Sequence, residues 1–290
     1  MDFYFFLIQL LNGIQYGLLL FLVASGLTLI FGIMGIINLA HGSFYMIGAY
    51  MAFMLSSMTG SLLVAIVVGL ALSVLLGIVL EWALFSRLYR RDHLEQVLLS
   101  YGLILVFEEL RSLIVGNDVH GVAVPEIFDW SIPLTATLAY PVYRLFMSAI
   151  CLLIAGLLYG LIHRTRLGMI IRAGASNREM VASLGINIKL MYRFVFALGV
   201  ALAAFAGMIA APVSSVYPGM GTQVLIICFV VVVVGSIGSI WGALAAALLI
   251  GVTDTFGKVL FPEAAGVSVY LLMAAILLWR PEGLASRARV

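Results

Sequence analysis

Residues 24–51, ASGLTLIFGIMGIINLAHGSFYMIGAYM, decide the fold class of this chain. The stretch is apolar enough to lie in a bilayer, but small and polar residues interrupt it: Gly32, Gly35, Asn38, His41, Gly42 and Ser43. An unsatisfied backbone polar group in lipid costs several kcal/mol, so such an interruption must be buried in protein or line a cavity. Interrupted apolar segments mark the substrate site in many transporters. The stretch therefore predicts a membrane transport protein.

The composition of the whole chain agrees with a membrane location. Its 290 residues are 64% hydrophobic and 10% charged, with a mean hydropathy of +1.20, whereas soluble domains carry about 25% charged residues. The net charge of +2 excludes a large basic face for nucleic acid. We expect one transmembrane permease domain over residues 1–290, with the lipid bilayer as its surroundings.

Nine apolar segments predict an all-α fold, a polytopic membrane helix bundle with broken or re-entrant helices. A membrane-spanning helix needs about 20 apolar residues. The segments are 5–31, 36–58, 62–85, 96–115, 144–163, 193–212, 222–236, 239–260 and 266–280. Only GSIGSIWG separates the seventh from the eighth, so these two form either two spans or one discontinuous pair, which would leave seven complete spans.

Lys and Arg residues predict the orientation in the membrane. They gather after the third segment, between the fifth and sixth, and at the C-terminus, whereas the 116–143 loop has acidic residues and no Lys or Arg. The basic residues are Arg87, Arg90, Arg91, Arg164, Arg166, Arg172, Arg178, Lys189, Arg193, Arg280, Arg287 and Arg289. The positive-inside rule places them in the cytoplasm. We therefore expect a bacterial-type inner-membrane protein with its N-terminus outside, its C-terminus inside, and the 116–143 loop packed irregularly over the external mouth.

Two glycine-rich interruptions occur at similar places in the two halves of the chain. Gly32-x-x-Gly35 opens the first and Gly235-x-x-Gly238 opens the second, and paired interruptions are typical of transporters built from repeats. The predicted substrate path is lined by Gly32, Gly35, Asn38, His41, Ser43, Gly235, Ser236, Gly238 and Ser239. The alternatives are that the glycines only allow close helix packing and that Asn38 and His41 form a structural clamp.

A short amphipathic helix is predicted in the cytoplasmic loop at about 164–192. Ser176-x-x-Glu179 fits a capping box, and Gly185 fits a left-handed C-terminal cap. Only about two helical turns fit between them, too few for a helix that is stable alone in water. The apolar stripe of Met180, Val181 and Leu184 favours docking into a partner's groove, and the alternative is a loop packed on its own bundle.

Three blocks of sequence resemble the permease subunits of branched-chain amino-acid ABC importers, of the high-affinity leucine, isoleucine and valine type. They are GLTLIFGIMGIINLAHGSFYMIGAYMA (26–52), RAGASN…LGIN in the cytoplasmic loop, and VVVVGSIGSIWGALAAALLIGVTDT (231–255). The resemblance implies ATP-driven import by alternating access. It also implies a second permease subunit of related fold, two ATPase subunits that carry the ATP and Mg²⁺, and a periplasmic substrate-binding protein.

The same resemblance assigns the helix that couples the permease to its ATPase. The residues concerned are Ser176, Glu179, Met180, Ala182, Leu184 and Gly185. Two positions depart from the family pattern. Ser43 stands where an acidic residue is frequent, which leaves the substrate open among branched-chain and related small or amide-type amino acids. The Glu-Ala-Ala core of the coupling helix reads Glu179-Met-Val-Ala182 here.

The sequence also favours an engine outside this chain. It has no G-x-x-x-x-G-K-[ST] phosphate loop, and few charges lie inside the segments, where ion-driven carriers keep their relays. Glu81 is expected at a cytoplasmic interface, and Glu108 is expected to pair with Arg111. Asp254 faces an outer vestibule or pairs with Thr253 or Thr255.

We expect no catalytic residue, no metal and no cofactor in this chain. Cys151 and Cys228 lie far apart in apolar segments and predict core packing. His41 and Ser43 lie two positions apart, so on one helix they would point to different faces and could not act as a dyad. The alternative to the importer subunit is a stand-alone channel or an ion-coupled secondary transporter.

Overall fold

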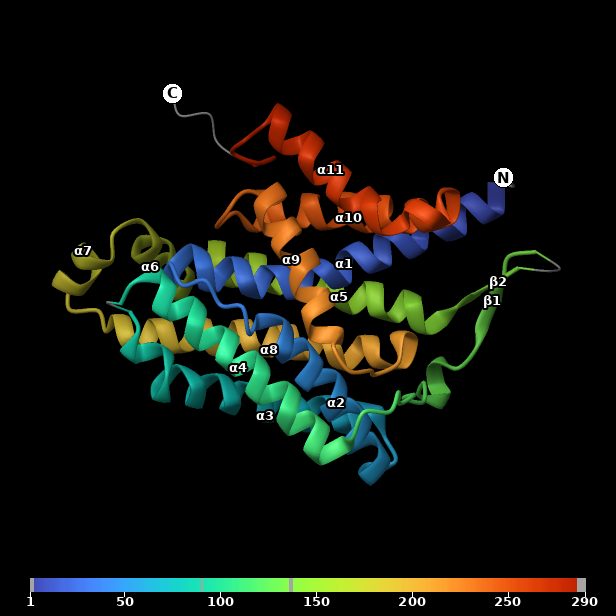
Figure 1. Cartoon of the computed structure of the whole chain (residues 1–290), viewed down its shortest axis with the longest axis horizontal. Helices are drawn as coiled ribbons and strands as arrows, with labels where there is room; N and C mark the ends of the chain where they lie inside the picture. The colour runs from blue at the N-terminus through green and yellow to red at the C-terminus, as the bar shows by residue number, and fades with distance from the viewer. Residues whose placement is uncertain (1–2, 90, 136–137, 286–290) are drawn as a thin grey trace.

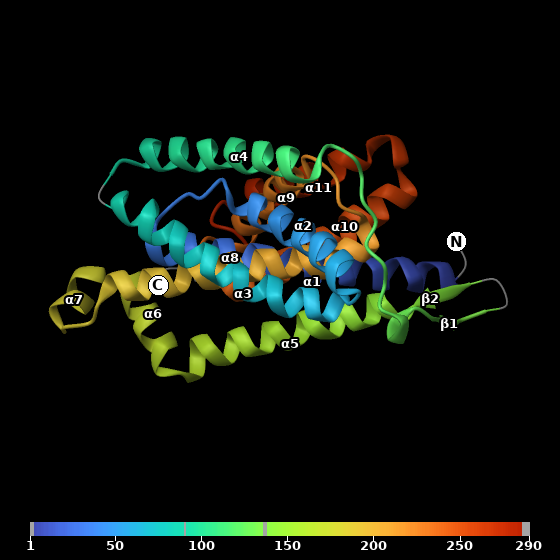
Figure 2. The ribbon, with the colours of Figure 1, turned by 90° about the horizontal axis from the view of Figure 1, so that it is seen from below.

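The computed structural model describes residues 3–89, 91–135 and 138–285, and it is a helical bundle (Figures 1 and 2). Each of the nine predicted apolar segments forms a helix, which confirms the polytopic all-α fold class. The helices are α1 (Phe3–Met34), α2 (His41–Thr59), α3 (Leu62–Ala83), α4 (His93–Val115), α5 (Val142–Arg164), α8 (Ile188–Ser214), α9 (Met220–Gly235), α10 (Ile240–Leu260) and α11 (Ala265–Trp279). Arg90, Arg287 and Arg289 lie outside the described residues.

Two long helices, α1 and α8, form the centre of the bundle. Their most apolar stretches are 83% buried, against 28% for α3 and 22% for α5. Helix α1 packs along α10, α8 and α5, and α8 packs along α2 and α3. The α1–α10 contact is close because small residues face each other: a Cβ added to Gly251 would lie 2.4 Å from the Gly17 nitrogen. Helix α4 lies along one edge of the bundle in Figure 2.

Five described helices are long and apolar enough to cross a bilayer: α1, α3, α5, α8 and α10. Helices α9 and α11 are shorter. The seventh segment is the 16-residue helix α9, which runs steeply across the bundle in Figure 1 and is followed by the 21-residue helix α10. With these helices the chain is a multi-pass membrane protein.

The two halves of the bundle each contain a helix that starts within the bundle. After α1, residues 35–40 are non-helical and α2 begins at His41, whose ring contacts the Val23 carbonyl at 2.9 Å. Val23 lies eleven residues before the end of α1, about 16 Å along the helix. After α8, residues 215–219 are non-helical before α9 begins. The first break lies where the sequence predicts an interruption, whereas the break at 215–219 was not predicted.

The first turns of the two broken helices meet. A Cβ added to Gly42 of α2 would lie 2.1 Å from the carbonyl oxygen of Gly221 in α9. From this contact α2 extends toward His120 in the loop between α4 and α5, on which Phe53 stacks at 4.2 Å between ring centroids. Helix α9 extends the other way, to the α10 turn. The two helices therefore diverge toward opposite ends of the bundle.

The connecting segments lie at opposite ends of the molecule. Two short helices, α6 (Arg166–Ser176) and α7 (Arg178–Ser183), project from one end, and the hairpin of β1 (Ser131–Pro133) and β2 (Ala139–Pro141) projects from the other, near the N-terminus (Figure 1). Three details differ from the sequence-based expectation. The 116–143 loop is not wholly irregular, α6 was not predicted, and α8 begins at residue 188 instead of 193.

Candidate functional site

The two glycine interruptions pack against each other. A Cβ added to Gly32, near the end of α1, would lie 2.8 Å from the Cα of Gly238 in the α9–α10 turn. No side chain fits between the two backbones at this distance, so glycine at position 32 allows the close approach. We call the contact of Gly32 with Gly238 the inner junction.

The rest of the second interruption forms a tight turn against the C-terminal segment. Gly235 packs on Gly242, and the Ser239 hydroxyl caps α10 by accepting a hydrogen bond from the Gly242 nitrogen at 3.1 Å. Ser236 adopts a left-handed backbone conformation, with φ of 80°. The Leu284 nitrogen donates to the Val234 carbonyl at 2.8 Å. The described C-terminal residues therefore hold this turn in place.

The polar residues of the first interruption are buried at the start of α2. Asn38 and His41 are fully buried, and Ser43 is 4% exposed. Asn38 Oδ1 accepts a hydrogen bond from the Ala40 nitrogen at 3.0 Å, and the His41 ring contacts the α1 backbone at Val23. Asn38 Nδ2 and His41 Nδ1 have no hydrogen-bond partner among the described residues. These contacts favour the clamp reading for Asn38 and His41, and their part in the substrate path stays a prediction.

A pocket of about 390 Å³ joins the first interruption to the loop that contains α6 and α7. Gly32 and Gly35 line one side, and Ser176 and Glu179 line the other, with Tyr192 of α8 between the helices. Gly35 is exposed and has a φ of 67°, so the chain turns there in a conformation that favours glycine. The structure thus brings predicted path residues and predicted coupling residues around one cavity.

The short helix α7 is present, but Ser176 does not cap it. Ser176 is the last residue of α6, and the N-cap of α7 is Asn177, whose Oδ1 accepts a hydrogen bond from the Met180 nitrogen at 3.0 Å. The capping-box prediction is therefore wrong by one residue. Gly185 does follow α7 with a φ of 80°, as predicted for a left-handed cap.

Helix α7 presents an exposed surface at the end of the bundle. Glu179, Ala182 and Gly185 are exposed, as are Met180 at 64% and Leu184 at 71%. Val181 is 4% exposed and packs on the protein itself, so only two of the three predicted apolar residues are available to a partner. One face of α7, with Val181, therefore packs on the bundle, and the face with Met180 and Leu184 is exposed.

A buried ion pair connects the base of α8 to α3. The Glu81 side chain is fully buried, and its Oε2 accepts a hydrogen bond from Arg193 Nε at 2.8 Å. The Tyr89 hydroxyl also donates to Glu81. Burial, followed by the hydrogen bond to Glu81, raises the pKa of Tyr89, which keeps the phenol protonated as a donor. Glu81 lies near the end of α3, and residues from two other segments enclose its carboxylate.

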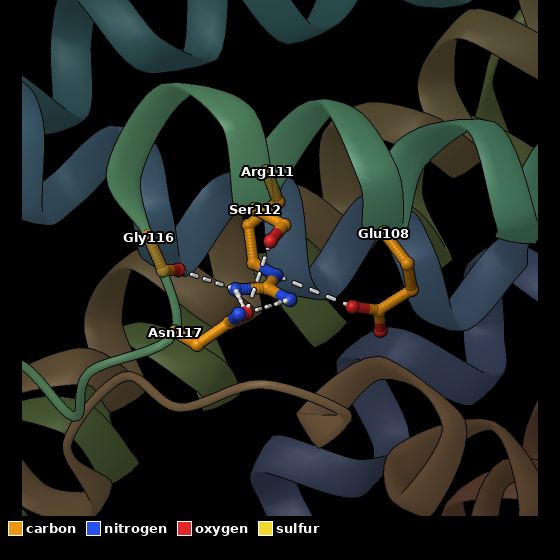
Figure 3. Close-up of polar contacts among 5 residues, drawn as sticks. All are labelled: Glu108, Arg111, Ser112, Gly116 and Asn117. Carbon is orange, nitrogen blue, oxygen red and sulfur yellow. Dashed lines mark hydrogen bonds and ion pairs between the residues drawn. The ribbon is translucent and has the colours of Figure 1, made fainter.

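At the C-terminal end of α4, Arg111 organises the start of the loop that leads to α5 (Figure 3). Its Nε donates to Glu108 at 3.2 Å, which confirms the predicted pair, and its Nη1 donates to the Gly116 carbonyl at 2.6 Å. Asn117 Oδ1 accepts from both terminal nitrogens and from Ser112. The loop then crosses the bundle end, where His120 and Val216 exchange two backbone hydrogen bonds of 2.8 Å.

A second cavity, of about 560 Å³, lies among α1, α5, α8, α9 and α10 and includes residues of the N-terminal half of α1. We call it the outer cavity, because the positive-inside rule predicts that the N-terminus lies outside. The cavity contains the Asp254 side chain, which pairs with Lys258 at 2.5 Å and not with Thr253 or Thr255. The pairing with Lys258 was not predicted, although a spacing of four residues on a helix is a usable signal. Among the described residues, no group of three His, Cys, Asp or Glu could hold a metal ion.

Comparison with known proteins identifies the family. A family described as "Branched-chain amino acid transport system / permease component" matches residues 9–278. The high-affinity branched-chain amino acid transport system permease protein BraD of Pseudomonas aeruginosa is 30% identical over 100% of this chain and 98% of its own length. The corresponding protein LivH of Escherichia coli K12 gives the same three values.

The likeness extends beyond these bacterial proteins. A probable branched-chain amino acid transport permease protein LivH of Methanocaldococcus jannaschii is 28% identical over 94% of this chain and 90% of its own length. No solved structure matches the chain. The relatives are transport permease components and not enzymes. The interrupted helices, the length of the match and the identity over the whole chain agree, and the chain belongs to the family of branched-chain amino acid transport system permease components.

Proposed function

We propose that this chain is the membrane-spanning permease subunit of an ATP-driven importer that moves branched-chain or closely related small amino acids into the cytoplasm. The observation that carries the proposal is the cavity that Gly32 and Gly35 share with Ser176 and Glu179. Around this cavity, the break that follows α1 lies beside the start of the exposed helix α7. A displacement of α7 would therefore reach the inner junction through contacting residues.

The exposed surface of α7 supports the proposal that a separate subunit supplies the energy for transport. Met180 and Leu184 are apolar, exposed and one turn apart, and α7 is too short to be stable without packing. We propose that an ATPase subunit covers Met180 and Leu184, and that ATP and Mg²⁺ bind to that ATPase subunit. A second permease subunit and a periplasmic binding protein complete the assembly. Alternating access then consists of α7 moving with the ATPase and the bundle opening around the inner junction.

The distribution of charge supports an inner-membrane orientation. The basic residues of α6 and α7 and of the α3–α4 turn, among them Arg87, Arg166, Arg172 and Arg178, lie at the end opposite the N-terminus (Figure 1). By the positive-inside rule this end is cytoplasmic. The β1–β2 hairpin then faces the periplasm, where a binding protein would dock.

The test is uptake of radiolabelled leucine by cells that lack other branched-chain amino-acid transport and express the chain with its partner subunits. We expect uptake only when the ATPase subunits are intact. The Met180→Glu/Leu184→Glu variant should abolish uptake and copurification of the ATPase. Met58→Glu, at a residue 79% exposed near the far end of α2, is the matched control and should retain both. Uptake by the purified chain alone in liposomes would contradict the proposal.

A further inference from the structure

The outer cavity combines charges of both signs with an apolar wall. Its charged residues are Asp254 and Lys258 of α10 and Arg144 of α5. Its hydroxyl and amide groups come from Gln9, Asn12, Gln15, Tyr16, Tyr45, Tyr217 and Gln223. Leu19, Met147, Val224 and Ile227 supply apolar surface. At about 560 Å³ the cavity has the size of small-molecule sites, which range over about 300–1,000 Å³.

The acidic group of the cavity is well buried and paired with one cation. Asp254 is 7% exposed, and its Oδ2 accepts from Lys258. Asp254 also lines the cavity, so its carboxylate is placed to accept a hydrogen bond from a cationic ligand.

Lys258 and Arg144 both line the cavity, and each makes a different contact with a neighbouring side chain. The Lys258 ammonium is 5.5 Å from the centre of the Tyr16 ring, and its side chain is 60% exposed. Arg144 Nη1 donates to Asn12 Oδ1 at 2.8 Å. With two cations and one anion, the cavity has one positive charge in excess, which favours a ligand that carries a carboxylate. Arg and Lys both bind carboxylates through charge-assisted hydrogen bonds.

We propose that the outer cavity binds a small zwitterionic amino acid, with its ammonium group on Asp254, its carboxylate on Lys258 and Arg144, and its aliphatic side chain on the wall formed by Leu19, Met147 and Ile227. The proposal rests on the proposed function and adds to it a defined substrate site within the permease. When an amino acid binds here, its ammonium group takes over part of the contact of Lys258 with Asp254, and its carboxylate takes over part of the contact of Asp254 with Lys258.

The experiment uses the full chain in lipid nanodiscs, with Ser214→Cys as a reporter in the cavity wall. Cys151 and Cys228 are buried, so a polar maleimide should label the introduced thiol. L-leucine is the probe, and we expect it to slow the labelling. Isovalerate lacks the ammonium group and isoamylamine lacks the carboxylate, so neither should protect at the same concentration. Equal protection by all three compounds, or none by leucine, overturns the proposal.

Two kinds of variant locate the effect. Asp254→Asn should raise the half-protecting leucine concentration by about tenfold or more, since a hydrogen bond to a charged group is lost. Glu109→Gln, at an exposed carboxylate of α4 outside the cavity, is its control. Val213→Trp should fill the cavity without changing its charges and remove protection, whereas Leu113→Trp, at a residue 73% exposed on α4, should not. Unchanged protection in both cavity variants overturns the site.

Uptake by the assembled transporter, measured in parallel, separates this proposal from the proposed function. Normal leucine uptake without protection of the reporter contradicts the cavity site and leaves the transport function standing. Protection without leucine uptake supports the site and contradicts the transport function.

Discussion

Arg193 at the base of α8 holds the fully buried carboxylate of Glu81 in α3 at 2.8 Å, across 112 residues of sequence. Helix α8 begins five residues before Arg193 and follows directly after α7. The pair therefore connects the base of the α7 loop to a helix of the membrane bundle. Tyr89, which lies against Tyr192 at 5.0 Å between ring centroids, completes the contact.

Breaking this ion pair should destabilise the protein. Arg193→Met leaves a buried carboxylate without its cation, and such a change costs about 3 kcal/mol. We expect the thermal unfolding midpoint in detergent to fall by several degrees. The double variant Glu81→Met/Arg193→Met should recover most of the loss, because the unpaired charge is removed with its partner.

The exposed pair of Arg91 with Glu95, at 3.7 Å, is the matched control. Its side chains are 63% and 47% exposed, so Arg91→Met should leave the midpoint almost unchanged. Equal effects of Arg91→Met and Arg193→Met would contradict the importance of burial.

The N-cap of α7 gives a second prediction. Asn177→Ala removes the acceptor of the Met180 nitrogen and should destabilise this short helix by about 1 kcal/mol. Hydrogen exchange at the amides of residues 180–183 should become roughly fivefold faster. Ser176→Ala is the control, since Ser176 ends α6. A larger effect of Ser176→Ala would show that Ser176, and not Asn177, caps α7.

Long-range contacts explain which site features the sequence could not reveal. The nine helices were predictable because each is a long apolar run, and the left-handed Gly185 was predictable because a glycine commonly ends a helix. The partners of Glu81 were not predicted because Tyr89 and Arg193 come from other segments. Nothing in the local sequence around Glu81 indicates that a cation reaches it.

Other errors arose where two local patterns competed. Ser176 and Asn177 are both good N-caps, and the choice depends on where α6 ends. Helix α6 contains Gly168 and Gly174, which favour a loop in isolation, yet both are buried on its packed face. The contact between Gly32 and Gly238 depends on tertiary packing, so the sequence showed two similar interruptions without showing that they touch.

The Arg111 contacts predict an ordered start of the loop between α4 and α5. Arg111→Lys cannot reproduce the planar fork that reaches Glu108, Gly116 and Asn117 together. Losing a charge-assisted hydrogen bond costs about 1.5–3 kcal/mol, so exchange of the backbone amides at 117–122 should become at least about tenfold faster. Arg164→Lys, at an exposed residue at the other end of the bundle, should leave this exchange unchanged. Protection equal to that of the unaltered protein would show that other contacts order the loop.

The inner junction predicts the effect of adding a single methyl group. Gly32→Ala places a Cβ 2.8 Å from the Gly238 backbone, so α1 and the α9–α10 turn must separate. Overpacking of this kind costs about 1–3 kcal/mol, and the shift changes the cavity that reaches Ser176. Leucine uptake by the assembled transporter should fall severalfold while the amount of protein in the membrane is preserved.

Gly102→Ala on α4 is the matched control, since its added Cβ meets nothing within 4 Å. Uptake and stability should stay at the level of the unaltered protein, because alanine is at least as favourable as glycine in a helix. If Gly32→Ala and Gly102→Ala transport equally well, the bundle absorbs the added methyl at the junction and the close contact has no role in transport. If both fail equally, the loss reflects a general intolerance of these helices and says nothing about Gly238. Only a selective loss at position 32 ties the approach of the two interruptions to movement of the substrate.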